Sequence, residues 1–176
     1  NGNGSANPDA AYALAFANGL TAGAVHVVWE KPDWPTPTEY RPGTTFNPQD
    51  FHDDLIADRL SSTGIMNFYS DSGSGVTITD WNVLNEPLHV THYYDTFETA
   101  GIYASNIEAW TDYFIRARAI RPDARLLIND YNILNAANDS ATIQYRDLIN
   151  SLLAAGAPID RIGLQAHIAL NTITKA

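Results

Sequence analysis

Apolar residues recur at helical spacing in four stretches of the chain. Asn7 and Asn47 each precede a proline, which pairs a capping side chain with a residue suited to the first helical turn. Glycines follow three of the stretches, as expected where helices end. The pattern predicts four helices. The first covers residues 8–18, and the second runs from Pro48 until Gly64, with Phe51, Leu55, Ile56 and Leu60 on one face. The third contains Trp110, Tyr113, Phe114 and Ala117, and the fourth contains Tyr145, Leu148, Ile149, Leu152 and Leu153 and ends at Gly156 and Pro158.

Short apolar runs lie before and between these helices, at residues 24–29, 78–84, 126–128 and 162–164. Runs of this length that alternate with helices of about a dozen residues indicate βα units, with parallel strands buried on both faces. The pattern therefore predicts an α/β protein that forms one domain or part of one. Long polar connections follow the first two strands, and loops after strands carry function in this architecture.

Charge and composition exclude several classes of partner. Ten Lys and Arg against 20 Asp and Glu give a net charge of −10, which repels nucleic acid and anionic membrane surfaces. The chain has no cysteine, so disulfides and thiolate metal sites are excluded. No apolar run approaches the roughly 18 residues of a membrane-spanning helix. We expect a neutral or cationic partner and no cofactor.

The strongest local signal is the segment 81–87, an apolar strand that ends in Asn85 and Glu86 and is stopped by Pro87. Consecutive residues of a regular strand point to opposite faces, but proline cannot continue the ladder and restricts the residue before it. The backbone can therefore turn at Glu86, so that both side chains face one cleft. As a bare tripeptide, Asn-Glu-Pro is equally compatible with an ordinary exit from a strand.

In its context this segment resembles the acid/base signature of clan A glycosidases, and specifically the Trp-Asp-Val-Val-Asn-Glu pattern of family 10 xylanases, with Asn82 where that family usually has Asp. Residues 120–132 resemble the lead-in and fifth strand of that family, and residues 159–167 resemble its sixth strand. Residues 18–29 resemble its third strand, usually written Arg-Gly-His-Thr-Leu-Val-Trp. The stretches 81–87, 120–132 and 159–167, which follow one another in the family's order, are together far more specific than any one of them.

The resemblance implies a (β/α)8 TIM barrel of which this chain supplies roughly the third to sixth βα units, so that residues 1–176 form a partial family 10 catalytic domain. A complete barrel typically needs about 250 residues. The implied activity is that of an endo-1,4-β-xylanase, with retention at the anomeric carbon and Glu86 as catalytic acid/base. The nucleophile, a glutamate that ends the seventh strand in the family, is expected beyond Ala176. Xylan, a polymer, implies a secreted protein.

The resemblance also implies sugar-binding roles for other side chains. Asn85 would hold the sugar 2-hydroxyl, His167 would contact the nucleophile, and Gln165 would face the cleft. The aromatic residues Tyr131 and Trp29 would contact sugar rings, although taken alone each is more often a core residue. His26 is a further sugar-binding candidate: it lies three residues before Trp29, where the family has four, and in a regular strand this switches the face from which it projects.

Two alternatives to a xylanase stay open at this point. Asn-Glu-Pro is shared widely within clan A, so another β-glucanase or cellulase is one alternative. The other is a non-catalytic, carbohydrate-binding half barrel, in which a second chain covers the open sheet edges. His89 and His92 lie three apart in a loop without a matched third ligand, so we expect no metal site.

Overall fold

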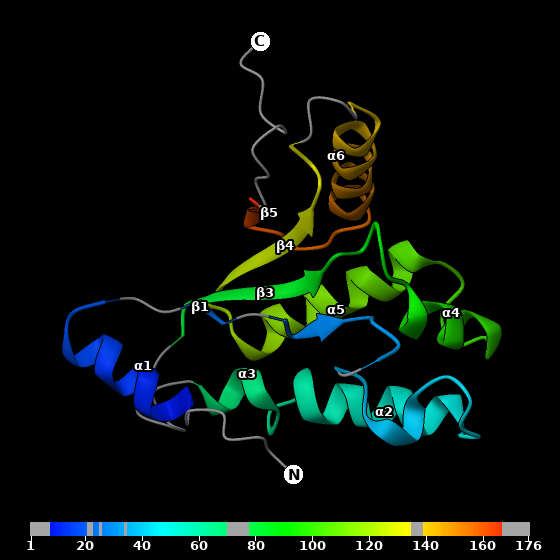
Figure 1. Cartoon of the computed structure of the whole chain (residues 1–176), viewed down its shortest axis with the longest axis horizontal. Coiled ribbons are helices and arrows are strands. Elements are labelled where there is room, and N and C mark those ends of the chain that lie inside the picture. The colour runs from blue at the N-terminus through cyan, green and yellow to red at the C-terminus, as the bar shows by residue number, and fades with distance from the viewer. Residues whose placement is uncertain are drawn as a thin grey trace.

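A computed structural model describes residues 8–20, 23–24, 26–33, 35–69, 78–134 and 139–166 (Figure 1). Helices and strands alternate along most of this chain. In order, the elements are α1 (Pro8–Ala17), β1 (Gly23–Ala24), β2 (Val28–Trp29), the 3-10 helix Thr38–Tyr40, α2 (Pro48–Arg59), α3 (Ile65–Phe68), β3 (Asp80–Asn85), α4 (His92–Thr99), α5 (Asn106–Ile120), β4 (Arg125–Tyr131), α6 (Asp139–Ala154) and β5 (Arg161–Gln165).

The strands form one parallel sheet, in which β3 pairs with β1 and β2 on one side and with β4 on the other, and β4 pairs with β5. Neighbouring strands are consecutive in the sequence, as in part of a (β/α) barrel. The predicted parallel α/β fold is therefore confirmed, and the four predicted helices are α1, α2, α5 and α6. Four details differ from the prediction: the first strand is divided in two, α2 ends at Arg59, the short helix α3 was not predicted, and α4 lies in a connection predicted to be a loop.

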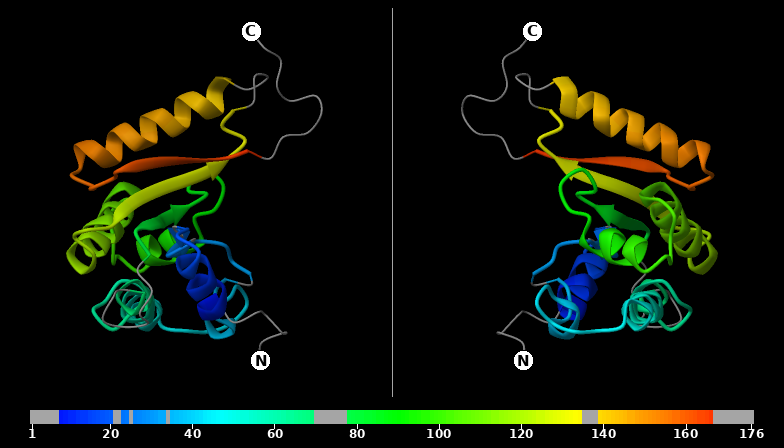
Figure 2. Two further views of the ribbon diagram at one scale, coloured as in Figure 1. Left: turned by 90° about the vertical axis from the view of Figure 1, so that its left-hand side faces the viewer. Right: turned by 90° about the vertical axis from the view of Figure 1, so that its right-hand side faces the viewer.

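Helices α5 and α6 lie beside the sheet, whereas α1 lies away from it (Figures 1 and 2). Most of the aromatic residues of the described chain are buried. Helix α5 packs on β3 and β4, while α6 runs alongside β5. Fully buried side chains between these layers include Trp81, Trp110, Tyr113, Phe114, Leu126, Ile128 and Leu152. The outer strand β5 is less covered, with Ile162 56% and Leu164 42% exposed.

Two one-residue irregularities interrupt the register of the sheet. Gly23 and Ala24 pair with Asp80 and Trp81, but Val28 pairs with Leu84, so the first strand has one residue more than β3 over this stretch. A second register shift lies between Asn82 and Leu84, where β3 has one residue more than β4. Such bulges redirect the side chains beside them, and both lie next to the polar ends of the strands described below.

Local hydrogen bonds fix where the helices begin. Asn47 caps α2 by accepting a hydrogen bond from Gln49 N at 3.1 Å, with Pro48 in the first turn. Ser105 caps α5 by accepting from Glu108 N at 3.1 Å. The cap signal predicted from Asn47-Pro48 is thus present in the structure.

Arg118, near the end of α5, connects the starts of β4 and β5. Its guanidinium donates to the carbonyl oxygens of Pro122 at 3.1 Å, Ala124 at 2.6 Å and Pro158 at 3.4 Å, and to the carboxylate of Asp160. The amino ends of two neighbouring strands therefore share one cation.

Within the described ranges, no helix is long and apolar enough to cross a membrane.

Candidate active site at the carboxyl ends of the strands

The polar residues singled out in the sequence gather where the strands end. Trp29 pairs with Asn85 across β2 and β3, and Asn85 pairs with Asn129 across β3 and β4. Tyr131 pairs with Gln165 across β4 and β5. Because the strands are parallel, their carboxyl ends meet at the same edge of the sheet, which is where barrel enzymes place their active sites.

Glu86 is held by donors on both oxygens. Trp29 Nε1 donates to Oε2 at 3.0 Å, and Gln165 Nε2 donates to Oε1 at 2.8 Å. The backbone of Glu86 has φ of 57°, a left-handed conformation that is unusual for a non-glycine residue, and its N–H donates to Asn129 O at 2.7 Å. The turn expected before Pro87 is present, and it directs the carboxylate of Glu86 to the same side as Asn85.

Asn85 is completely buried and its side-chain oxygen is saturated. Oδ1 accepts from Asn82 Nδ2 at 3.0 Å, from Asn129 Nδ2 at 2.8 Å and from Gln165 Nε2 at 3.4 Å. A Cβ at Gly163 would lie 2.5 Å from Asn129 Oδ1, so glycine leaves the space that the Asn129 side chain needs. The Nδ2 atom of Asn85 has no partner among the described residues. Nδ2 is therefore a hydrogen-bond donor of this cluster that no described residue uses.

His26 lies in the first bulge and joins this cluster. It has φ of 64°, its ring lies 4.8 Å from that of Trp29, and its Nδ1 lies 3.2 Å from Asn82 Nδ2. Burial lowers the pKa of His26, and the nearby Glu86 charge opposes this effect. The expectation that His26 projects from the opposite face held only for a regular strand; the extra residue and the left-handed backbone bring His26 and Trp29 together.

Tyr131 forms the other side of the cluster together with His89, which the sequence had suggested only as a weak metal ligand. The two rings stack at 3.8 Å between centroids, and His89 Nδ1 lies 2.7 Å from Asp130 Oδ1. Asp130 also accepts from Leu88 N at 3.0 Å. Burial raises the pKa of Asp130, and its hydrogen bonds and His89 counteract that. This carboxylate fastens the loop that follows Glu86 to β4.

Glu30 is a buried acid that the sequence did not single out. It is 0% exposed, its Oε1 accepts from Trp110 Nε1 at 2.9 Å and its Oε2 from Tyr94 N at 3.2 Å. Burial raises the pKa of Glu30 to about 8, because its effect is larger than that of the two hydrogen bonds, which lower the pKa. Glu30 follows Trp29 in the chain, but its side chain points away from Glu86 and toward helices α4 and α5. Its place directly after an apolar strand was visible in the sequence, but its burial was not.

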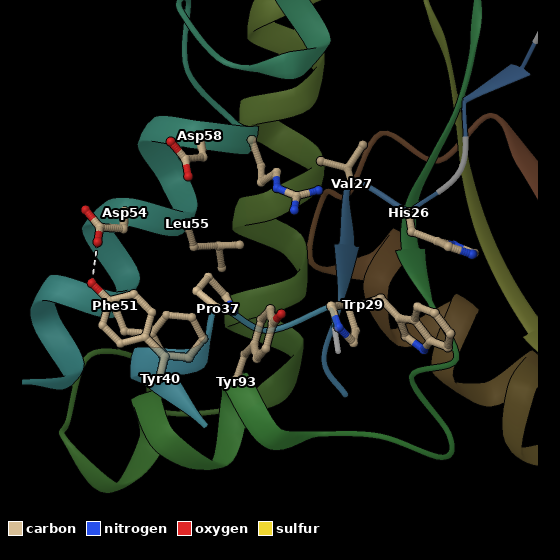
Figure 3. Close-up of a pocket in the computed structure, with 12 residues that line it drawn as sticks. His26, Val27, Trp29, Pro37, Tyr40, Phe51, Asp54, Leu55, Asp58 and Tyr93 are labelled. Atoms are coloured by element: carbon tan, nitrogen blue, oxygen red, sulfur yellow. Dashed lines mark hydrogen bonds between the residues drawn. The ribbon is translucent and has the colours of Figure 1, made fainter. Parts of the chain in front are cut away.

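A cavity of about 410 Å³ lies beside Trp29 and His26, between β2 and α2 (Figure 3). Its wall is mainly apolar, with Val27, Leu55 and Phe51, and Asp54 and Asp58 of α2 line it as well. Figure 3 shows the ring of Trp29 at one end of this cavity, apart from the side chains of α2. The cavity therefore shares His26 and Trp29 with the Glu86 cluster, but Glu86 itself is not among its lining residues.

One predicted site residue cannot be placed in the same way. His167 lies outside the described residues. Among the residues that are described, no group of three or more His, Asp and Glu side chains is arranged to hold a metal ion.

The arrangement of an oriented carboxylate, an amide and aromatic rings at the strand ends suits the protonation of a glycosidic oxygen. A sequence profile described as Glycosyl hydrolase family 10 matches residues 6–176. The chain belongs to glycosyl hydrolase family 10. This family assignment and the (β/α) barrel fold agree with the resemblance of residues 81–87, 120–132 and 159–167.

Individual members of family 10 support this assignment. The chain is 35% identical to endo-1,4-beta-xylanase A of Thermoanaerobacterium saccharolyticum over 123 residues, which cover 68% of the chain and 10% of that protein. It is 33% identical, over 68% of its length and 11% of the relative, to exoglucanase XynX of Acetivibrio thermocellus.

Solved family 10 structures show the same fold. TsXylA, described as an intracellular xylanase from T. saccharolyticum, superposes with a TM-score of 0.71 at 25% identity, over 94% of this chain and 50% of that one. A mutant of Xylanase10C from Cellvibrio japonicus in complex with xylopentaose superposes with a TM-score of 0.69 at 24% identity, over 92% of this chain and 31% of that one. The chain thus spans half or less of the length of these proteins.

Proposed function

We propose that the intact protein is a retaining endo-1,4-β-xylanase in which Glu86 is the catalytic acid/base. The observation that carries this proposal is the hydrogen bonding of Glu86: each carboxylate oxygen has its own side-chain donor, Trp29 on one side and Gln165 on the other. A proton donor held in this way stays in one orientation toward the oxygen of a leaving sugar.

The remaining parts of the mechanism follow from the requirements of retention. A retaining glycosidase needs a second carboxylate about 5 to 5.5 Å from the acid, which attacks the anomeric carbon and forms a glycosyl-enzyme. We propose that a glutamate outside residues 1–176 supplies it. By the resemblance, Asn85 then holds a hydroxyl of the sugar under attack, with His167 beside the nucleophile and Tyr131 against the next sugar.

The first experiment compares the intact protein with its Glu86→Gln variant on xylan. Loss of general acid catalysis lowers kcat/KM by about 10²- to 10⁴-fold, whereas Glu98→Gln, a change of an exposed glutamate of α4, leaves it unchanged. Proton NMR of the first product formed is expected to show the β-anomer. Full activity of the Glu86→Gln variant, or an initial α-anomer, contradicts the proposal.

A β-glucanase or cellulase is the alternative that a specific observation favours, because a relative is described as an exoglucanase. Rates measured side by side on xylan, mixed-linkage β-glucan and carboxymethyl cellulose decide between them: a preference for either glucan over xylan overturns the xylanase assignment.

We also propose that the protein acts outside the cell, because a polysaccharide does not cross a membrane. Detection of the intact protein in the culture medium of its source organism tests this.

A further inference from the structure

Asn82 occupies the centre of the polar cluster, although its place in a strand would not predict this. Residues three apart in a regular strand point to opposite faces, yet Asn82 Nδ2 lies 3.0 Å from Asn85 Oδ1. The register shift between Asn82 and Leu84 explains the approach, because it places an extra residue between the two asparagines relative to β4. On the other side, the bulge at His26 brings the imidazole to the same amide nitrogen.

The chemistry of these atoms fixes the direction of both hydrogen bonds. An amide nitrogen donates and does not accept. Asn82 Nδ2 therefore donates to Asn85 Oδ1 and, at 3.2 Å, to His26 Nδ1. A ring nitrogen that accepts carries no proton, so the proton of the imidazole resides on Nε2. Asn82 Oδ1 has no partner among the described residues, so the nitrogen holds this side chain in place.

We propose that Asn82 is a positioning residue that keeps His26 neutral with its proton on Nε2, so that the cleft beside Glu86 offers a sugar oxygen a hydrogen-bond donor and no cation. The role for the sugar rests on the proposed function; the tautomer does not. Two further polar groups lie close to this pair: Asn85, which accepts from Asn82, and Glu86, directly after β3, whose charge acts on His26.

An aspartate at position 82, which family 10 usually has, reverses this arrangement. A carboxylate accepts and cannot donate, so it would bind a protonated Nδ1 and stabilise the imidazolium. It would also leave Asn85 Oδ1 without one of its three donors. The same fold would then present a cation beside Glu86. The asparagine therefore sets the charge of this part of the cleft as well as its geometry.

The test is nitrogen NMR of the imidazole in the intact protein, with His26 assigned from the spectrum of His26→Gln. In the unsubstituted chain near neutral pH, Nδ1 is expected at the position of an unprotonated ring nitrogen and Nε2 at that of a protonated one. In Asn82→Asp, Nδ1 becomes protonated and the titration midpoint of His26 rises by about one pH unit or more.

Asn129→Asp is the matched control, since it places the same charge in the same network on Asn85 and on the neighbouring strand. Its effect on the His26 midpoint is expected to be clearly smaller, with the tautomer unchanged. A protonated Nδ1 in the unsubstituted chain overturns the proposal, and this reading stands even if Asn82→Asp does not fold. Because no turnover is measured, the result is independent of whether the intact protein hydrolyses xylan.

Discussion

The two oxygens of Glu86 have different donors, so the contribution of each can be measured by changing a single side chain. Trp29 donates to Oε2 through its indole nitrogen, and phenylalanine keeps an aromatic ring there without the donor. Hydrogen bonds to a charged group contribute about 1.5 to 3 kcal/mol. Trp29 is thus an orienting group as well as a candidate stacking surface for a sugar.

Trp29→Phe in the intact protein is expected to lower kcat/KM on xylan by about 10- to 100-fold, because Glu86 loses one of the two donors that orient it. The thermal midpoint should change little. Trp110→Phe serves as control: it removes the indole donor of Glu30, so it should lower the midpoint more than the rate. Equal rates for Trp29→Phe and the unsubstituted protein would exclude an orienting role for Trp29.

Particular residues also show which parts of the site could be predicted from the sequence and which could not. The strand end at Asn85 and Glu86 could be predicted, because Pro87 forces a turn and the neighbouring residues resemble a known motif. The placement of His26 could not, because the face of a side chain depends on the path of the backbone, and a bulge leaves no clear mark in the sequence. Asn129 was likewise missed, although it directly follows the apolar run 126–128 of β4.

Between elements, Glu30 is the connection with the clearest energetic consequence. It joins the end of β2 to the first turn of α4 through Tyr94 N and to α5 through Trp110. In the unfolded chain its carboxyl ionises near the ordinary value of 4.5, but in the folded chain it stays protonated until about pH 8. The folded state therefore binds the extra proton between these values, and its stability falls as pH rises through this window.

Urea unfolding at pH 5 and pH 8 measures this effect. Relative to Glu30→Gln, which has no proton to lose and keeps an oxygen for the Trp110 N–H, the unsubstituted chain is expected to lose a few kcal/mol of unfolding free energy between the two pH values. Parallel pH profiles of the two proteins would contradict a buried, protonated Glu30. α4 itself was not predicted, because the sequence around it reads as a polar connection.

At the scale of the whole molecule, the sheet has an outer strand, β5, whose far side has no neighbouring strand in the described chain. Ile162 and Leu164 are exposed there, in addition to the unpaired backbone groups of an edge strand. The alternation of strands and helices predicted parallel strands, and the resemblance to family 10 implied the barrel in which successive strands are neighbours. Neither predicted how much of β5 is exposed, which depends on what lies beside it.

We therefore expect the chain of 176 residues alone to self-associate at micromolar concentration, as judged by sedimentation velocity. The double variant Ile162→Thr with Leu164→Thr should sediment as a monomer, because it removes the apolar side chains of the edge. Ile143→Thr with Leu153→Thr removes similarly exposed apolar residues of α6, 47% and 48% exposed, and should have no such effect. If the unsubstituted chain is monomeric over the same range, the β5 edge is not an associating surface.

The contacts of Arg118 have a consequence for how the molecule opens. A single guanidinium holds the carbonyl oxygens before β4 and β5, and its partner Asp160 also accepts from Leu126 N in β4. Neither strand can separate at its amino end without breaking the same set of bonds. The amide hydrogens of β4 and β5 should consequently exchange with solvent in one cooperative step, as a single foldon that carries Tyr131 and Gln165 with it.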